Sequence, residues 1–267
     1  MYSFFHKVFS DWEGGLVFDC FSVWHWMYIV LILALIVWSV LRLKGKSAAE
    51  QKKGIDVFIN IVMGLYVADL FLMPFALGEI DVDKLPFHAC TSMCVMCFCS
   101  NYNRFLAKFR IHFALLGAIS AMMYMVYPSG VMAYETHPLS YRAVQTLLFH
   151  SLLLVYGVLT IVFDERGLRI RECYKDALVL VGLTGWAFLG NTMYSGAAGE
   201  YSRDFNWFFI RRDPFGLLPE AVAPYLAPVV NFLALFLVEL AVYFIYAQVK
   251  KYLCARKAES KTKLKSA

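Results

Sequence analysis

A cysteine-rich apolar segment, Leu85–Asn101 (LPFHACTSMCVMCFCSN), carries the side chains best suited to covalent chemistry. A thiol attacks only as its thiolate, and a nearby imidazole can take the thiol proton and later return it to a leaving alkoxide. We therefore expect Cys90 to be a nucleophile and His150, which lies inside another apolar segment, to be its base. The alternative role is packing, because cysteine is a small residue that is usually buried.

Such a thiol–imidazole pair at the depth of the acyl chains suits acyl transfer from a phospholipid ester, because scarce water lets a thioester survive until an alcohol arrives. Asp69, or Asn191 through a hydrogen bond, could fix the imidazole tautomer, as the third member of a triad does. Asn191 could also donate to an oxyanion. A carboxylate at the depth of Asp69 needs a partner, for which a histidine is the natural choice. Structural roles compete with these, since buried asparagines often join helices.

The composition places these residues in a membrane. Of the 267 residues, 60% are hydrophobic and only 17% are charged, and the mean hydropathy is +0.59. A soluble domain of this length carries more charge, and here the apolar residues form blocks long enough to cross a bilayer. The sequence predicts an all-α polytopic bundle that forms a single domain over residues 1–267. Its seven expected spans are Phe21–Leu41, Ile55–Leu77, Leu85–Asn101, Ile111–Tyr127, Tyr141–Phe163, Cys173–Ser195 and Tyr225–Gln248.

The basic residues indicate how the bundle is oriented. Alternate loops and the tail hold 19 of the 25 Lys and Arg residues, and the opposite side holds 6. Because cytoplasmic loops carry the excess of Lys and Arg, the sequence predicts an amino terminus outside and a carboxyl terminus in the cytoplasm. Residues 254–267 are expected to form a basic tail that meets anionic headgroups. Nucleic acid is not an expected partner, because the tail lacks aromatic platforms.

The expected orientation gives each polar residue inside a span an approximate depth. Cys90, Asp69, His150 and Asn191 all fall roughly 6–14 Å from the outer ends of their spans, at 1.5 Å per residue. Structural polar residues would have no reason to share a depth, so the convergence favours one site. Glu239 is the exception, since it lies near the midplane and is expected to be a buried structural acid.

Two outer segments, Met1–Gly15 and Tyr201–Leu218, mix aromatic and charged residues. Both are typical of interfacial segments, and residues 1–19 lack the pattern of a signal peptide. Each segment could roof a cavity that opens to the outer leaflet, or could serve only as an anchoring belt.

Three motifs give the chain a family resemblance. They are LPFHAC at Leu85–Cys90, THPLSYRAVQTLLFH at Thr136–His150 and FLGNTMY at Phe188–Tyr194. They resemble the YwaF-type bacterial integral membrane proteins, which relate to the transmembrane-protein-164 acyltransferase family. The resemblance covers the chain from about Leu85 to the last span, and differs from the bacterial pattern at Thr91 and Thr192.

This resemblance implies a polytopic lipid acyltransferase in the plasma membrane of a bacterium, acting on membrane phospholipids without a cofactor or a metal. It maps the nucleophile to Cys90 and the histidine to His150. It also maps His88, His137 and Asn191 to the site, where we expect them to bind substrate together with Asp69.

Other classes of protein are alternatives. Cys94-Val-Met-Cys97 is a C-x-x-C motif, which a thiol-redox protein would use, although Cys20 is the one cysteine expected near the outer surface. A transporter could use Asp69, His150 and Glu239 as a proton path, but the chain shows no internal repeat. A metal site built from the third span would lack paired ligands from a second segment.

Overall fold

The computed structural model describes residues 17–77, 82–132, 137–194, 206–211, 218–219 and 221–265. Over these residues the protein is helical and contains no strand, as the sequence predicts. The segment Met1–Gly15 lies outside the described residues, and so does most of Tyr201–Leu218.

The long helices are α2 (Val23–Leu43), α3 (Ala48–Leu77), α5 (Arg110–Val126), α7 (Tyr141–Phe163), α8 (Tyr174–Tyr194) and α9 (Ala223–Lys265). Shorter elements lie between them: η1 (Val82–Lys84), α4 (Ala89–Cys99), η2 (Leu106–Phe109), α6 (Ser129–Met132), η3 (Ile170–Glu172) and η4 (Trp207–Phe209). The predicted spans thus correspond in order to α2, α3, α4, α5, α7, α8 and α9.

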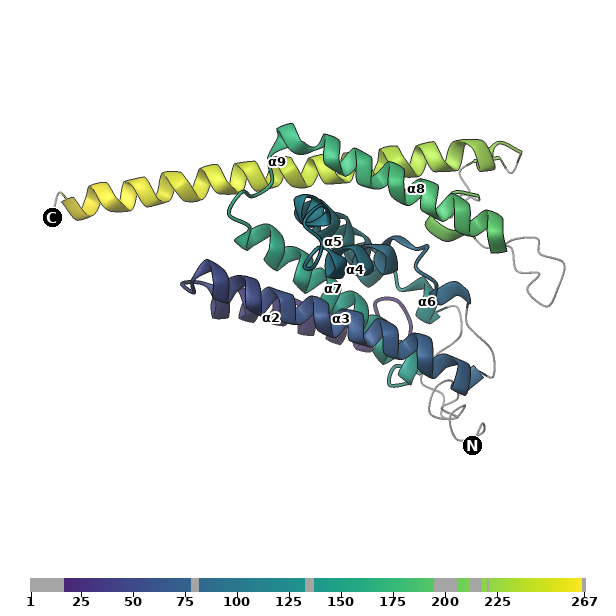
Figure 1. The fold of residues 1–267 in the computed structure, drawn as a ribbon. Coiled ribbons are helices and arrows are strands. Elements are labelled where there is room, and N and C mark those ends of the chain that lie inside the picture. Colours follow the sequence, from purple (N-terminus) through teal and green to yellow (C-terminus); the bar gives the residue numbers. More distant parts are fainter. Residues whose placement is uncertain are drawn as a thin grey trace.

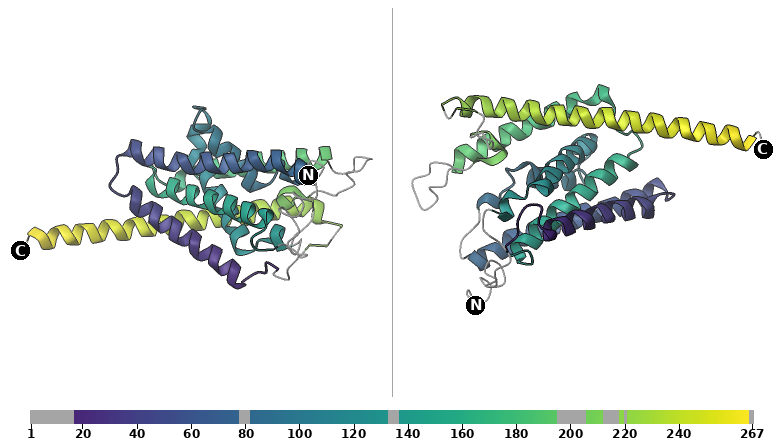
Figure 2. Two further views of the ribbon diagram at one scale, coloured as in Figure 1. Left: turned by 90° about the horizontal axis from the view of Figure 1, so that it is seen from below. Right: turned by 180° about the vertical axis from the view of Figure 1, so that it is seen from behind.

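The helices form three layers (Figure 1). α2 and α3 lie on one side, α8 and α9 lie on the other, and α4, α5 and α7 fill the space between them, as the view from behind also shows (Figure 2, right). In the apolar windows of α5 and α7, 67% and 61% of the residues are buried, against 11% for both α2 and α9. The inner layer is therefore the core, and the outer helices present apolar faces that suit lipid.

A close approach of two backbones holds the core together. Gly157 on α7 faces Ala114 and Ala118 on α5, and a Cβ atom at Gly157 would lie 2.6 Å from the Ala114 carbonyl oxygen. Small residues let membrane helices approach in this way, because packing rather than the hydrophobic effect drives their association in lipid. The approach fixes the distance between α5 and α7, which both contribute residues to the site described below.

In the part of the chain that the structure describes, six helical segments are long and apolar enough to cross a membrane: Val23–Leu43, Ala48–Leu72, Leu106–Val126, Tyr141–Phe163, Ile170–Tyr194 and Ala223–Arg256. The protein is thus a multi-pass membrane protein. α4, which corresponds to the predicted span Leu85–Asn101, has 11 residues, or about 16 Å at 1.5 Å per residue. This is shorter than the hydrocarbon core of a bilayer, which is roughly 30 Å thick.

The segment that contains α4 nevertheless returns along α3. Lys84 Nζ lies 2.8 Å from Asp69 Oδ2 near one end of α3, and Arg110 Nη2 lies 2.8 Å from Asp56 Oδ1 near the other end. Residues 56 and 69 are about 20 Å apart along a helix axis. The chain between Lys84 and Arg110 therefore runs back over that length, so that α3 and α5 point the same way.

Two helices are longer than their predicted spans. α3 begins seven residues before Ile55, at Ala48, because Ser47 and Glu50 form a capping box: Ser47 N donates to Glu50 Oε2 at 3.0 Å, and Glu50 N donates to Ser47 Oγ at 3.4 Å. α9 continues to Lys265, so the predicted basic tail extends the last helix.

Candidate functional site

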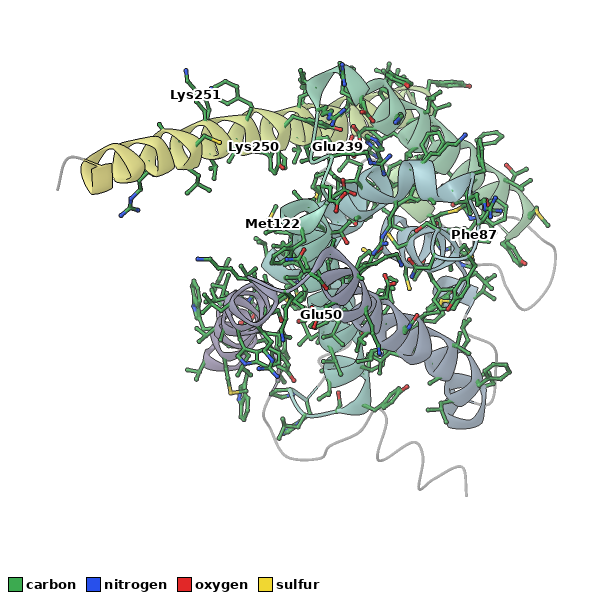
Figure 3. The ribbon with its side chains drawn as sticks, turned by 60° about the vertical axis from the view of Figure 1, so that its left-hand side comes forward. Glu50, Phe87, Met122, Glu239, Lys250 and Lys251 are labelled. Atoms are coloured by element: carbon green, nitrogen blue, oxygen red, sulfur yellow. The ribbon has the colours of Figure 1, made fainter. Side chains whose placement is uncertain are left out.

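The site is built around the turn that precedes α4. Phe87, labelled in Figure 3, anchors this turn. Its ring stacks on that of Trp186, with centroids 4.9 Å apart, and lies 4.8 Å from the ring of Trp207. Gly190 on α8 leaves room for it, since a Cβ atom there would lie 2.5 Å from the Phe87 ring. Trp186 Nε1 also donates to the Pro86 carbonyl at 2.6 Å. The beginning of α4 is therefore fixed against α8 and η4.

Cys90 is the second residue of α4 and not, as the predicted span Leu85–Asn101 implied, part of its second turn. The helix begins at Ala89 because His88, the residue before it, has an extended backbone (φ −79°, ψ 153°). The first backbone N–H groups of a helix have no partner within it, and they stabilise negative charge nearby. The Cys90 side chain therefore lies in the first turn of α4, beside these backbone N–H groups. It is half-buried and lies within hydrogen-bond reach of Ser120 on α5.

The contacts of His150 indicate which of its two ring nitrogens carries the proton. Its Nδ1 lies 2.7 Å from the Thr146 carbonyl oxygen, which can only accept, so Nδ1 carries the proton. Nε2 is then the basic nitrogen of a neutral imidazole, which is the atom that a general base uses. The ring lies flat against Tyr124 of α5, with ring centroids 3.8 Å apart and an angle of 9° between the planes.

Tyr124 connects the two predicted catalytic residues. It stacks on His150, and Cys90 is among its electrostatic neighbours. Three different helices, α4, α5 and α7, thus bring Cys90, Tyr124 and His150 into one place. Within the described ranges no hydrogen bond joins Cys90 to His150, so the structure shows the two groups near the same tyrosine and not yet in contact.

His88 belongs to the same neighbourhood. It is half-buried, it interacts electrostatically with His150, and its ring lies 6.4 Å from that of Phe209 in η4. The described part of Tyr201–Leu218 therefore lies against the residue next to α4.

Asp69 does not have the histidine partner that the sequence suggested. Its Oδ2 lies 2.8 Å from Lys84 Nζ, and Tyr141 at the start of α7 is an electrostatic neighbour. The side chain is only 2% exposed, and a buried carboxylate is held more strongly by a permanent ammonium charge than by a neutral imidazole. The expectation that Asp69 fixes the His150 tautomer is wrong in this structure, because the Thr146 carbonyl does so.

Asn191 binds the main chain of η4, the short helix that lies near the turn before α4. Its Oδ1 accepts from the Trp207 N–H and its Nδ2 donates to the Trp207 carbonyl, both at 3.0 Å. On α9, Asn231 Nδ2 donates to the neighbouring carbonyls of Phe208 and Phe209, at 3.3 and 2.6 Å. These two side-chain amides hold η4 near the turn before α4. Among the described residues, no hydrogen bond joins either amide to His150.

His137 lies just before α7 and is 7% exposed. Its Nδ1 accepts from the Leu139 N–H at 3.2 Å, and Ser140, which follows, caps α7 by accepting from the Ala143 N–H. The residue therefore lies in the connection that sets where α7 begins.

Sequence reasoning missed Tyr124, Ser120 and Lys84. The depth argument applied to α5 would have placed Ser120 and Tyr124 near the level of Cys90, but aromatic and hydroxyl residues near a span end resemble ordinary interfacial residues. Lys84 carried no signal, because its partner Asp69 is 15 residues away in a different element.

A cavity of about 470 Å³ lies elsewhere, at the opposite end of α3, α5 and α7. Its lining includes Lys52, Arg110, Thr160 and Arg166, none of which contacts the Cys90 neighbourhood. In the described part of the chain no group of three or more His, Cys, Asp or Glu side chains is arranged to hold a metal ion.

A family model described as the TMEM164 family matches residues 20–247. The chain belongs to the TMEM164 family. The matched region of this family member begins just before α2 and ends within α9, so it includes Cys90, Tyr124 and His150 and leaves out the basic end of α9. No curated protein and no solved structure matches the chain.

Proposed function

We propose that the protein is a membrane lipid acyltransferase that moves a fatty acyl group on glycerophospholipids, with Cys90 as nucleophile and His150 as base. The observation that carries this proposal is the state of His150: the Thr146 carbonyl holds Nδ1–H, and the ring stacks on a neighbour of Cys90. The resemblance of the LPFHAC and FLGNTMY motifs to the YwaF-type membrane proteins, which relate to the transmembrane-protein-164 acyltransferase family, supports the same chemistry.

The first half-reaction acylates the cysteine. His150 Nε2 takes the proton from Cys90 Sγ, and the sulfur attacks the carbonyl carbon of the donor ester. Unpaired backbone N–H groups at the start of α4 can donate to the oxyanion that forms. When the C–O bond breaks, the imidazolium returns its proton to the departing alkoxide, and a lysophospholipid leaves behind a thioester on Cys90.

The second half-reaction transfers the acyl group. An acceptor hydroxyl gives its proton to His150 Nε2 while its oxygen attacks the thioester carbonyl. The tetrahedral intermediate expels the Cys90 thiolate, which takes the proton back from the imidazolium. The new ester leaves, and the thiol and the neutral imidazole are restored.

The family resemblance supplies the substrate class, and the charges around the pair suit it. Lys84 and Arg142 are electrostatic neighbours of His150 and Tyr124, respectively, and both suit the phosphate of a glycerophospholipid. Asp69 would orient Lys84, Asn191 would hold η4 over the bound lipid, and His88 would face the ester. His137 would help to bind the substrate from the connection that precedes α7.

The proposal includes a topology. The chain crosses the membrane seven times, with α4 and its flanking turns as the third crossing, the amino terminus outside and the carboxyl terminus in the cytoplasm. The return of residues 84–110 along α3 and the excess of basic residues in alternate loops support it. The membrane would be the plasma membrane of a bacterium, and the site would open to the outer leaflet.

Tags placed at residues 2 and 260 test this topology. In intact cells an impermeant reagent should label only the first tag, and after permeabilisation it should label both. Labelling of both tags from the same side would show that the number of crossings is even.

The chemistry is tested by trapping the thioester. Purified protein incubated with phospholipid carrying a labelled acyl chain should acquire label that hydroxylamine releases. Cys90→Ala should abolish the label and the transfer, whereas Cys99→Ala, which changes another half-buried cysteine at the far end of α4, should retain both.

His150→Ala should abolish transfer, and the Cys90→Ala/His150→Ala double variant should be little worse than either single variant, as expected for residues that act as one unit. Transfer by Cys90→Ala at the rate of the unchanged protein would refute the mechanism.

A further inference from the structure

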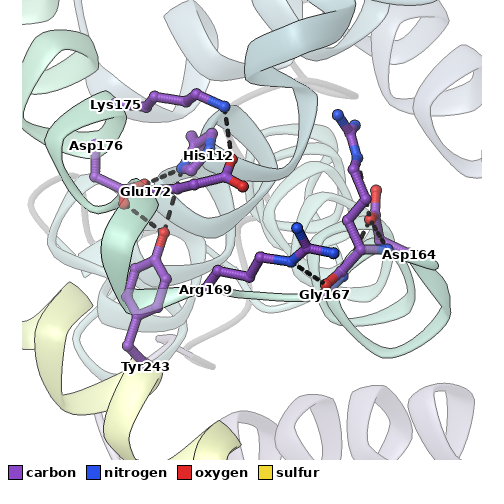
Figure 4. A network of polar contacts seen from close by, with 9 residues as sticks. His112, Asp164, Gly167, Arg169, Glu172, Lys175, Asp176 and Tyr243 are labelled. Atoms are coloured by element: carbon purple, nitrogen blue, oxygen red, sulfur yellow. Dashed lines mark hydrogen bonds and ion pairs between the residues drawn. The ribbon is translucent and has the colours of Figure 1, made fainter.

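A second buried polar cluster lies at the opposite end of the bundle, where α5, α8 and α9 meet (Figure 4). His112 Nδ1 lies 2.8 Å from Asp176 Oδ1, and the Tyr243 hydroxyl donates to Asp176 Oδ2 at 2.6 Å. Asp176 is fully buried and His112 is 2% exposed. The catalytic proposal above uses none of these residues.

The hydrogen bonds fix where the protons lie. Asp176 accepts at both oxygens, so it is a carboxylate and His112 Nδ1 carries a proton. Among the described residues His112 Nε2 has no hydrogen-bond partner, and it lies 3.9 Å from Glu172 Oε2. Glu172 is 25% exposed and binds Lys175 at 2.6 Å, so it links the cluster to the surface.

Glu239 lies one turn before Tyr243 on α9, at the level where this helix passes α8 (Figure 3). It is 1% exposed, and neither of its carboxylate oxygens has a hydrogen-bond partner within the described structure. Its electrostatic neighbours are Asp176 and Tyr243. An ionised carboxylate in this place would be buried, unpaired and close to a second carboxylate, each of which disfavours the charge.

We propose that Glu239 is a proton-binding site, which exchanges its proton with the surface near Arg166–Lys175 through Tyr243, Asp176 and His112. A proton rather than a metal cation fits the site, because Asp176 already accepts two hydrogen bonds and Glu239 is the remaining free acid of the cluster.

The neighbours of Glu239 set when it can release the proton. They are Asp176 from α8 and Tyr243 from α9 itself, and His112 from α5 reaches Glu239 through its bond to Asp176. Glu172, Lys175 and Cys173 complete the rim between η3 and α8.

During uptake, His112 Nε2 accepts a proton from the surface and Nδ1 passes its own proton to Asp176. Asp176 then passes a proton to the Tyr243 oxygen as the Tyr243 hydroxyl turns toward Glu239 and gives its proton to that carboxylate. His112 is left protonated at Nε2, and it returns to its first tautomer by releasing that proton to the surface and taking one from solvent at Nδ1. The net result is that one proton has left the solvent and one carboxylate has become an acid.

Infrared spectroscopy of the purified full-length protein in lipid nanodiscs tests the site. The spectrum at neutral pH should contain the carbonyl band of a protonated carboxylic acid, and ¹³C labelling of glutamate should shift this band. Glu239 is the one buried glutamate in the described residues, and Asp69 and Asp176 are both paired. Absence of the band, or a band that only labelled aspartate shifts, would overturn the proposal.

A variant pair sharpens the assignment. Glu239→Gln keeps the size and the hydrogen-bonding of the neutral acid, so it should fold and lose the band completely. Glu165→Gln changes an exposed acid near the same end of the molecule and should keep the full band. An unchanged band in Glu239→Gln would contradict the assignment; if this variant does not fold, the labelled wild-type spectra still decide it.

The route is tested by exchange in D₂O. Glu172→Gln should slow the deuterium shift of the band without removing it, because the surface entry to His112 is weakened. An unchanged exchange rate would refute the route. Melting that depends on sodium concentration, in a protein that lacks the acid band, would show instead that a cation occupies the site.

Discussion

The two ends of the bundle each contain a buried histidine, and the two histidines differ in what holds Nδ1. His150 donates to a backbone carbonyl one turn earlier in its own helix, whereas His112 donates to the carboxylate of Asp176 on a different helix. A carbonyl orients an imidazole without adding a full charge, so the ring stays neutral and its other nitrogen stays basic. The buried Asp176 carboxylate also binds Tyr243, so the His112 ring belongs to a set of hydrogen bonds that joins α5, α8 and α9.

The comparison teaches that position in an apolar helix does not by itself tell how a histidine is held. Both residues lie inside predicted spans and both are nearly inaccessible. The distinguishing feature is the partner: His150 Nδ1 is held within its own helix, whereas the bond from His112 Nδ1 to Asp176 joins α5 to α8.

The largest effect that would test this difference is on stability. Asp176→Ala leaves the His112 and Tyr243 donors buried without an acceptor, and we expect it to cost about 3–5 kcal/mol of unfolding free energy, as breaking a buried pair does. Thermal unfolding in detergent measures it, and Glu165→Ala, an exposed acid near the same end, should cost almost nothing. Equal melting of the two variants would mean that the cluster at α5, α8 and α9 does not hold the helices together.

An intermediate effect is expected on the rate of acyl transfer when the ring beneath His150 is changed. Tyr124→Ala removes a stacked ring worth about 0.5–1.5 kcal/mol, which corresponds to a roughly tenfold slower reaction at the upper limit. Tyr124→Phe keeps the ring and should be close to the unchanged protein. If both variants lose the same activity, the hydroxyl rather than the stacking matters, and the account of how the base is held needs revision.

The smallest effect is expected for the deeper cysteines of α4. Cys94 and Cys97 are fully buried in the core, so their replacement by alanine should cost about 1 kcal/mol of stability each and leave the rate of transfer unchanged. Labelled-lipid assays and melting curves together check this. Loss of activity equal to that of Cys90→Ala would favour the thiol-redox alternative for the C-x-x-C motif.

The fold was largely predictable because apolar blocks of membrane length have few ways to fold. The predicted limits of α5, α7 and α8 agree with the structure to within about one residue. The early start of α3 was also encoded, since Ser47-Ala-Ala-Glu50 is a capping-box pattern that the hydropathy argument ignored. The beginning of α4 was not predictable from hydropathy, because Leu85–His88 is as apolar as the helix that follows it.

The site was less predictable, because its contacts join residues from different helices. Depth along the membrane normal brought Cys90 and His150 to one level, but depth says nothing about rotation around each helix. The partner of Asp69 was Lys84 rather than a histidine for this reason, and Asn191 faced Trp207 rather than the imidazole. Only packing in three dimensions places Tyr124 between the helices that carry the predicted pair.

The hydrogen bond from His150 to the Thr146 carbonyl also affects how the protein can change during evolution. Because the acceptor is a main-chain atom, any residue that keeps α7 helical at position 146 provides it, so the side chain there can drift freely. A histidine that is oriented by an aspartate side chain requires two particular residues in the sequence. His150 is oriented by a main-chain carbonyl, so only the histidine itself and an intact helix are required. Relatives that keep the chemistry should therefore vary at position 146 and still share the same tautomer at the histidine.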